Sequence, residues 1–194
     1  MKRMEEIDMV SLTALWLPIV LAAVAVFVAS SVIHMVFKYH TSEYRQLPDE
    51  ATILDAMRSA KTEPGFYSFP YAGTMKEMSS PEMTEKYTQG PVGTINVNPS
   101  GPPAMGKNLM LWFAYSIVVG IFAGYLASRT LAAGTHYLQV FRVVGCASFM
   151  AYSFAHFSDA VWKTKPWSMT FKHVFDGLVY ALLTAGVFGW LWPQ

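Results

Sequence analysis

The stretch from residue 170 to residue 192 constrains the fold of this chain more than any other. Between Val174 and Trp192 its only charged residue is Asp176. About 20 apolar residues at ~1.5 Å each cross a hydrocarbon layer of roughly 30 Å, so this stretch predicts a membrane-spanning helix. Trp190 and Trp192 stand at its end, where indole rings prefer the membrane interface.

Three further stretches have the same character, and they cover residues 10–37, 109–131 and 137–162. The first is too long to be a cleaved signal peptide, whose apolar region is about 7–15 residues. The chain is 53% hydrophobic and 14% charged, against roughly 25% charged in soluble domains. The sequence therefore predicts an all-α integral membrane protein with four transmembrane helices in a compact bundle, surrounded by a lipid bilayer.

The predicted organisation has three parts. They are residues 1–37, an N-terminal tip and the first helix; residues 38–108, an extramembrane loop; and residues 109–194, transmembrane helices 2–4. The positive charges near the ends of the spans do not decide the membrane orientation.

The long loop is polar and rich in proline, yet it carries signals of local structure. Pro48-Asp49-Glu50 and Ser80-Pro81-Glu82 predict the starts of two short helices, with Ser80 as a cap. Residues 92–97 predict a brief strand. An aromatic group between Phe66 and Tyr71 indicates that the loop folds onto the membrane surface or over the bundle. We therefore expect the loop to be partly folded.

Small residues recur at every fourth position of the predicted spans, which places them along one face of each helix. The last span carries Gly177, Ala181, Ala185 and Gly189, and the second carries Gly120 and Gly124. In lipid, small residues let helix backbones approach closely. We expect these ridges to face another helix, within the chain or in a homo-oligomer or larger membrane complex.

Five ionisable residues lie in the loop-side third of the spans: His34, His156, Asp159, His173 and Asp176. The two His/Asp pairs have three-residue spacing, so each pair shares a helix face. Ionisable groups inside a membrane are costly and often functional. Imidazole and carboxylate together could bind a divalent metal or relay protons, and two of the histidines could ligate haem.

A structural interpretation of the same residues stays open. Asp159 can pair with Lys163 and Asp176 with Lys172, both at four-residue spacing, while the histidines form hydrogen bonds at the interface. Asp176 is the deepest of them. We expect it to point inward and to find a partner in Lys172, a histidine or a hydroxyl, because an unpaired carboxylate there is costly.

Several function classes find no support. Residues 101–107 match the spacing G-x-x-x-x-G-K, but Asn108 follows instead of serine or threonine, so we expect no nucleotide. A net charge of +1 gives no surface for nucleic acid. The motifs of a soluble catalytic domain do not occur, so the sequence does not support an enzyme. The single Cys146 is expected to pack as a small apolar residue.

Four segments carry a family resemblance: residues 11–20, 30–35 and 105–107, and the run that begins at Phe175-Asp-Gly-Leu-Val-Tyr. Together with Leu47-Pro-Asp-Glu they resemble an uncharacterised family of bacterial four-span inner-membrane proteins. The resemblance implies a multi-pass protein of the bacterial inner (cytoplasmic) membrane. It implies no substrate and no site, because that family has no assigned function.

Two functions follow from these observations. The first is a structural or accessory integral membrane protein that assembles through its small-residue ridges. The alternative is a small metal-binding, proton-relaying or transport protein that uses the His/Asp cluster in the loop-side part of the bundle.

Overall fold

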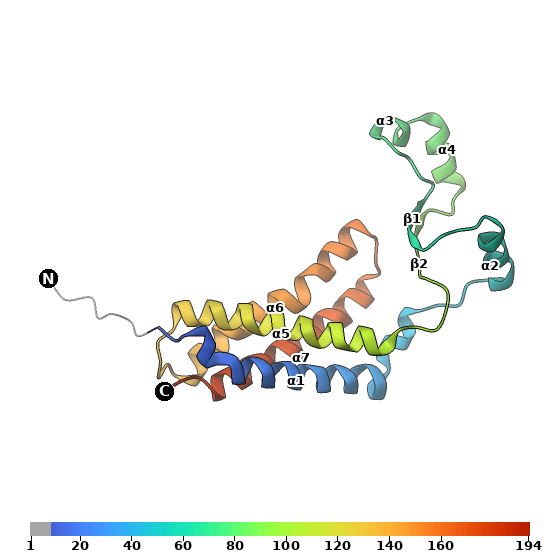
Figure 1. Cartoon of the computed structure of the whole chain (residues 1–194). Helices are drawn as coiled ribbons and strands as arrows, with labels where there is room; N and C mark the ends of the chain where they lie inside the picture. The colour runs from blue at the N-terminus through green and yellow to red at the C-terminus, as the bar shows by residue number, and fades with distance from the viewer. Residues whose placement is uncertain (1–8) are drawn as a thin grey trace. The chain divides into compact units, whose positions relative to one another are not determined.

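The computed structural model describes residues 9–194, which fall into two units (Figure 1). The helical unit comprises the described residues up to Tyr44 together with 104–194, and the loop unit comprises Arg45–Pro103. The long helices of the helical unit are α1 (Trp16–Val32), α5 (Met105–Thr130), α6 (Tyr137–Trp162) and α7 (Trp167–Trp190). The loop unit contains α2 (Glu50–Ser59), β1 (Gly65–Phe69), α3 (Met75–Met78), α4 (Pro81–Gln89) and β2 (Gly93–Val97).

Four long apolar helices were predicted, and within the described residues four are found. Helix α1 is extended by the turns η1 (Leu12–Leu15) and η2 (Ile33–Phe37), so that its helical stretch runs over Leu12–Phe37. Each of the four helical stretches is long and apolar enough to cross a membrane. The largest boundary difference is at α5, which begins at Met105 instead of residue 109. The hydropathy of these stretches therefore predicts their limits well.

The ridge of small residues on α7 lies against α6. Ala181 and Ala185 are buried, and the Cβ of Ala185 is 3.2 Å from the position that a Cβ on Gly145 of α6 would take. A Cβ on Gly177 would lie 3.2 Å from the backbone of Tyr152, and one on Gly189 would lie 2.7 Å from the ring of Tyr137. Larger side chains would force the two helices apart.

The two glycines of α5 sit where other helices pass closely. A Cβ on Gly120 would lie 3.4 Å from Ile19 of α1, and one on Gly124 would lie 3.0 Å from Phe188 of α7. Consecutive long helices run in opposite directions along the helical unit, as Figure 1 shows for α5, α6 and α7. The loop-side ends of α1, α5, α6 and α7 therefore lie together.

Two groups of buried side chains fill the helical unit at different levels. The group near the chain ends is entirely apolar apart from one indole, and its members are Val10, Leu15, Ile19, Ala22, Ala123, Ala127, Val140, Val144, Phe188 and Trp192. The loop-side group is richer in aromatic hydroxyls, and its members are Val26, Ile33, Val119, Tyr152 and Tyr180. The buried polar groups of the terminal half are the hydroxyls of Ser128, Ser148 and Thr184, whereas the loop-side half also buries His40 and Asp176.

The end of the helical unit that holds residues 192–194 is closed by hydrogen bonds to backbone carbonyls. The indole of Trp192 donates to the carbonyl of Ala132 at 2.9 Å, and the N–H of Gly134 donates to the carbonyl of Pro193 at 2.8 Å. Gly134 has φ of +73°, a conformation that favours glycine. These bonds hold the end of the chain against the short turn between α5 and α6.

The loop unit is partly folded, as the sequence predicts. Ser80 caps α4, because its Oγ accepts a hydrogen bond from the N–H of Met83 at 3.2 Å. The predicted strand is β2, and it pairs antiparallel with β1, with Gly65 opposite Val97. The aromatic run of β1 was not predicted as a strand. Its pairing with β2 gives the backbone of this otherwise irregular stretch its hydrogen-bond partners.

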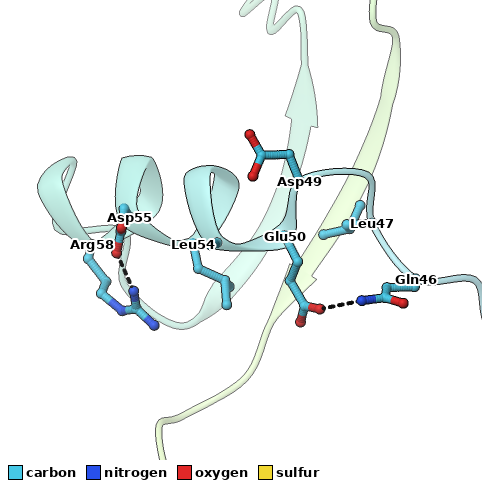
Figure 2. A pocket seen from close by; sticks show the side chains of 8 residues that line it. Gln46, Leu47, Asp49, Glu50, Leu54, Asp55 and Arg58 are labelled. Atoms are coloured by element: carbon cyan, nitrogen blue, oxygen red, sulfur yellow. Dashed lines mark hydrogen bonds and ion pairs between the residues drawn. The ribbon is translucent and has the colours of Figure 1, made fainter.

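An open hollow lies along one face of α2 in the loop unit (Figure 2). Its side chains bond mainly to one another: the amide of Gln46 donates to Glu50 at 3.5 Å, and Arg58 pairs with Asp55 at 2.5 Å. The ionic pair is exposed to solvent. Exposed pairs of this kind are ordinary surface features, so the hollow is not a candidate site.

Candidate functional site

The candidate site lies at the loop-side end of the helical unit, where the chain turns back after the first helix. Lys38 adopts a left-handed conformation with φ of +52°, which ends the helix. The short turn η3 (Tyr39–Glu43) follows and lies on α7. The ammonium of Lys172 on α7 donates to the carbonyl of Tyr39 at 2.8 Å and to the hydroxyl of Ser42 at 2.7 Å. These bonds fix η3 above the bundle.

His40 of η3 stands at the centre of the site, between two carboxylates. Its Nε2 is 2.7 Å from Oδ2 of Asp176, and its Nδ1 is 2.6 Å from Oε1 of Glu43. His40 is 9% exposed and Asp176 only 2%. The hydroxyl of Tyr39 donates to the second oxygen of Asp176. Both nitrogens of one buried imidazole therefore face a carboxylate.

Three further imidazoles continue from His40 in a row of neighbouring rings. The ring centroids of His34 and His40 are 4.6 Å apart, and those of His40 and His173 are 4.9 Å apart. His156 stacks on His173 at 4.7 Å, with only 12° between the ring planes. Nε2 of His173 is also 3.4 Å from Oε2 of Glu43. The row draws on η2, η3, α7 and α6.

Two sets of three residues have the geometry of metal ligands. One is His34, His40 and Asp176; the other is His40, Glu43 and His173. In each set, one ligand atom from every residue lies within 4.8 Å of the others. We call these five residues, His34, His40, Glu43, His173 and Asp176, the imidazole–carboxylate cluster.

The charges around the cluster are unequal. The side chains of Glu43 and Asp176 are each 3% exposed, and the ammonium of Lys172 lies 4.0 Å from Oε1 of Glu43. Buried carboxylates are costly without cationic partners. A further positive charge in the cluster would offset this cost.

The structure brings some of the predicted site residues together and separates another. His34, His173 and Asp176 belong to the cluster, and His156 lies beside it. Asp159 is not part of either set. It pairs with Lys163 and with Lys165, each at 2.7 Å, as the structural interpretation predicted for Lys163.

The expected environment of Asp176 is confirmed in one respect and wrong in another. Asp176 points inward and binds a hydroxyl and a histidine, as predicted. Its pairing with Lys172 was a wrong prediction, because Lys172 binds the η3 backbone and Ser42 instead. Four-residue spacing permits such a pair, but η3 offers both side chains closer partners.

Sequence reasoning missed His40 and Glu43, although every contact described above between two residues of the cluster involves one of them. Both lie after the first span, in what the sequence predicts to be the loop. One signal was present: His40 and Glu43 are three residues apart, so one helical turn places them on the same face. The reversal at Lys38, which returns that turn onto α7, has no signature in the sequence.

Comparison of the chain with protein-family models, with curated proteins and with solved structures finds no match in any of the three. The functional interpretation therefore depends on the geometry of the cluster.

Proposed function

We propose that this chain is a multi-pass membrane protein that binds a divalent transition-metal ion in the imidazole–carboxylate cluster. One observation carries the proposal: His34, His40 and Asp176 place two imidazole nitrogens and one carboxylate oxygen within 4.8 Å of one another. These residues come from η2, η3 and α7, so only the folded chain brings them together. Three protein ligands leave a coordination position for water or another ligand.

The outer surface of the helical unit supports a membrane location. Large apolar side chains are exposed along all four long helices, including Trp16 at 63% and Phe122 at 69%. Soluble monomers rarely expose contiguous apolar patches larger than a few hundred Å². Lipid tails would cover these side chains at no cost. The bacterial inner membrane remains our proposal for the compartment.

The ligand atoms indicate the class of metal. Imidazole nitrogen suits zinc, copper, iron and nickel, whereas magnesium and calcium prefer oxygen ligands alone. A zinc ion would bind at ~2.0–2.2 Å from such nitrogen and oxygen atoms, so Nε2 of His40 and Oδ2 of Asp176, which are 2.7 Å apart, would separate slightly to admit it. Haem fits the arrangement less well. The two axial ligands of a haem bind from opposite faces of the macrocycle, whereas neighbouring rings of the row lie only 4.6 and 4.9 Å apart, centroid to centroid.

The structural or accessory function remains a second proposal, since a metal-binding protein can also serve a larger complex or a homo-oligomer. The ridge on α7 supports it less than the sequence suggested. Its small residues already pack against α6 of the same chain, so no second protein chain is needed to cover them.

Metal binding can be tested with the full chain purified in detergent and stripped with a chelator. Equilibrium dialysis against Zn²⁺, followed by elemental analysis, should show bound zinc. His40→Gln should abolish it, because His40 belongs to both ligand sets. His34→Gln should weaken zinc binding. Because His34 is exposed, this substitution should disturb folding less than His40→Gln.

The matched control is Asp159→Asn, which removes a carboxylate of the same loop-side region outside both ligand sets. It should retain the zinc of the unaltered chain. Zinc retention by folded His40→Gln, or no zinc in the unaltered chain, would refute the proposal. Size-exclusion profile and circular dichroism establish folding for each variant.

A further inference from the structure

The ring of His40 offers its two nitrogens to two different sets of ligands. Nε2 faces Asp176 at 2.7 Å, and Nδ1 faces Glu43 at 2.6 Å. A metal ion on the Asp176 side would bind Nε2 with His34, whereas an ion on the Glu43 side would bind Nδ1 with His173. With this assignment the two sets share one residue but no ligand atom.

The second set is built as well as the first. The side chain of Glu43 is 3% exposed, and each of its oxygens faces an imidazole: Oε1 faces His40, and Oε2 lies 3.4 Å from Nε2 of His173. His173 is itself held between the rings of His40 and His156. A carboxylate aimed at two imidazoles in a nearly closed position is a divalent-metal ligand arrangement.

We infer that the cluster holds two transition-metal ions, bridged by the imidazole of His40. This inference rests on the proposed function and adds Glu43 and His173 as ligands of a second ion. Each ion would lie between one ring nitrogen and its carboxylate. The neutral ring carries one N–H; its proton would leave to solvent when both nitrogens bind metal, so the bridging ring would carry one negative charge that both ions share.

The ring between the ions makes the pair stable. Two divalent ions repel each other, and the negatively charged bridge together with Asp176 and Glu43 offsets that repulsion. Lys172 opposes the second ion, since its ammonium lies 4.0 Å from Oε1 of Glu43. We therefore expect the Asp176 side to fill first and the Glu43 side to fill at a higher metal concentration.

Zinc stoichiometry in the full-length chain tests this inference. Equilibrium dialysis should give two zinc ions per unaltered chain and one for either Glu43→Gln or Asp176→Asn. Both variants keep the size of the side chain and remove one carboxylate. Asp159→Asn, the matched control, should keep two. Glu43→Gln should lose the weaker of the two zinc-binding sites, and Asp176→Asn should lose the tighter one.

A second measurement needs no variant to fold. In the unaltered chain loaded with two Cu²⁺ ions, electron paramagnetic resonance should show spins coupled through the shared imidazole. The chain loaded with one Cu²⁺ should show an ordinary isolated signal of full intensity.

The outcomes separate this inference from the proposed function. One zinc ion per unaltered chain, insensitive to Glu43→Gln, would refute the second ion and leave metal binding intact. Two zinc ions with uncoupled copper spins would refute the bridge. No bound metal at all would refute both.

Discussion

Gly177 is the position where one methyl group should most disturb the helical unit. It lies next to Asp176 on the face of α7 that meets α6. An added Cβ would meet the Oγ of Ser153 and would lie 3.2 Å from both the carbonyl carbon and the Cβ of Tyr152. Ser153 is fully buried, and turning its hydroxyl away would give up its bond to the carbonyl of Val174. The Tyr152 backbone cannot turn away.

We therefore expect Gly177→Ala to lower the free energy of unfolding. Forcing an extra group into a packed interior costs about 1–3 kcal/mol. Replacing glycine by alanine inside a helix returns about 1 kcal/mol. The net effect should be a loss of roughly 0–2 kcal/mol.

Gly186→Ala provides the matched comparison, because Gly186 lies in the same helix. Its added Cβ would have the Tyr137 hydroxyl as nearest neighbour, at an ordinary 3.7 Å. Gly186→Ala should gain the stabilisation of alanine in a helix without the cost of crowding a packed interior. The difference between the two variants should thus be about 1–3 kcal/mol, whatever helix remains in the unfolded state.

Reversible unfolding in mixed detergent micelles, followed by circular dichroism, measures both variants. Pushing α6 from α7 at Gly177 should also disturb the stacking of His156 on His173, so Gly177→Ala should bind zinc more weakly than Gly186→Ala. Equal unfolding free energies for the two variants would show that α6 and α7 do not pack as closely as described.

Three further predictions concern other contacts. Lys172→Met should speed hydrogen exchange in residues 39–43, because it removes two hydrogen bonds that hold this turn. A hydrogen bond to a charged group is worth about 1.5–3 kcal/mol. Unchanged exchange, measured by mass spectrometry, would show that Lys172 does not hold η3 on α7. His156→Phe keeps a flat ring but no ligand atom, so elemental analysis should find the zinc content unchanged, whereas a loss would make His156 a ligand. The hydrogen bond from Lys86 lowers the pKa of the Glu82 carboxyl. This pair therefore stabilises α4 at pH values above the ordinary glutamate pKa, and the stabilisation is lost as the pH falls through the lowered pKa. An NMR titration should show the Glu82 midpoint rising in Lys86→Met and not moving in the control Lys76→Met.

The long helices and the chemistry of the site differ in how far the sequence predicts them. A span is a local property, since twenty apolar residues in a row need no knowledge of the rest of the chain. The cap at Ser80 is local for the same reason, because it depends on a bond three residues away. Both could be predicted.

The contacts of Asp176 are not local. Its partners, Tyr39 and His40, are 137 and 136 residues away in the sequence, and they reach it only through the reversal at Lys38. The spacing rule that suggested Lys172 describes an isolated helix and not one covered by another segment. The burial of a carboxylate could be foreseen, whereas the identity of its partners could not.

The terminal half of the helical unit bears on where the imidazole–carboxylate cluster could exchange an ion. At that level all four long helices contribute buried hydrocarbon, from Ile19 through Ala127 and Val144 to Phe188. Among the described residues the buried polar groups there are the hydroxyls of Ser128, Ser148 and Thr184, so an ion would lose its hydration and meet no buried imidazole or carboxylate. If the cluster binds metal as we propose, an ion that reached it from the loop side would leave by the loop side. Carrying that ion across a membrane would require the helices to separate.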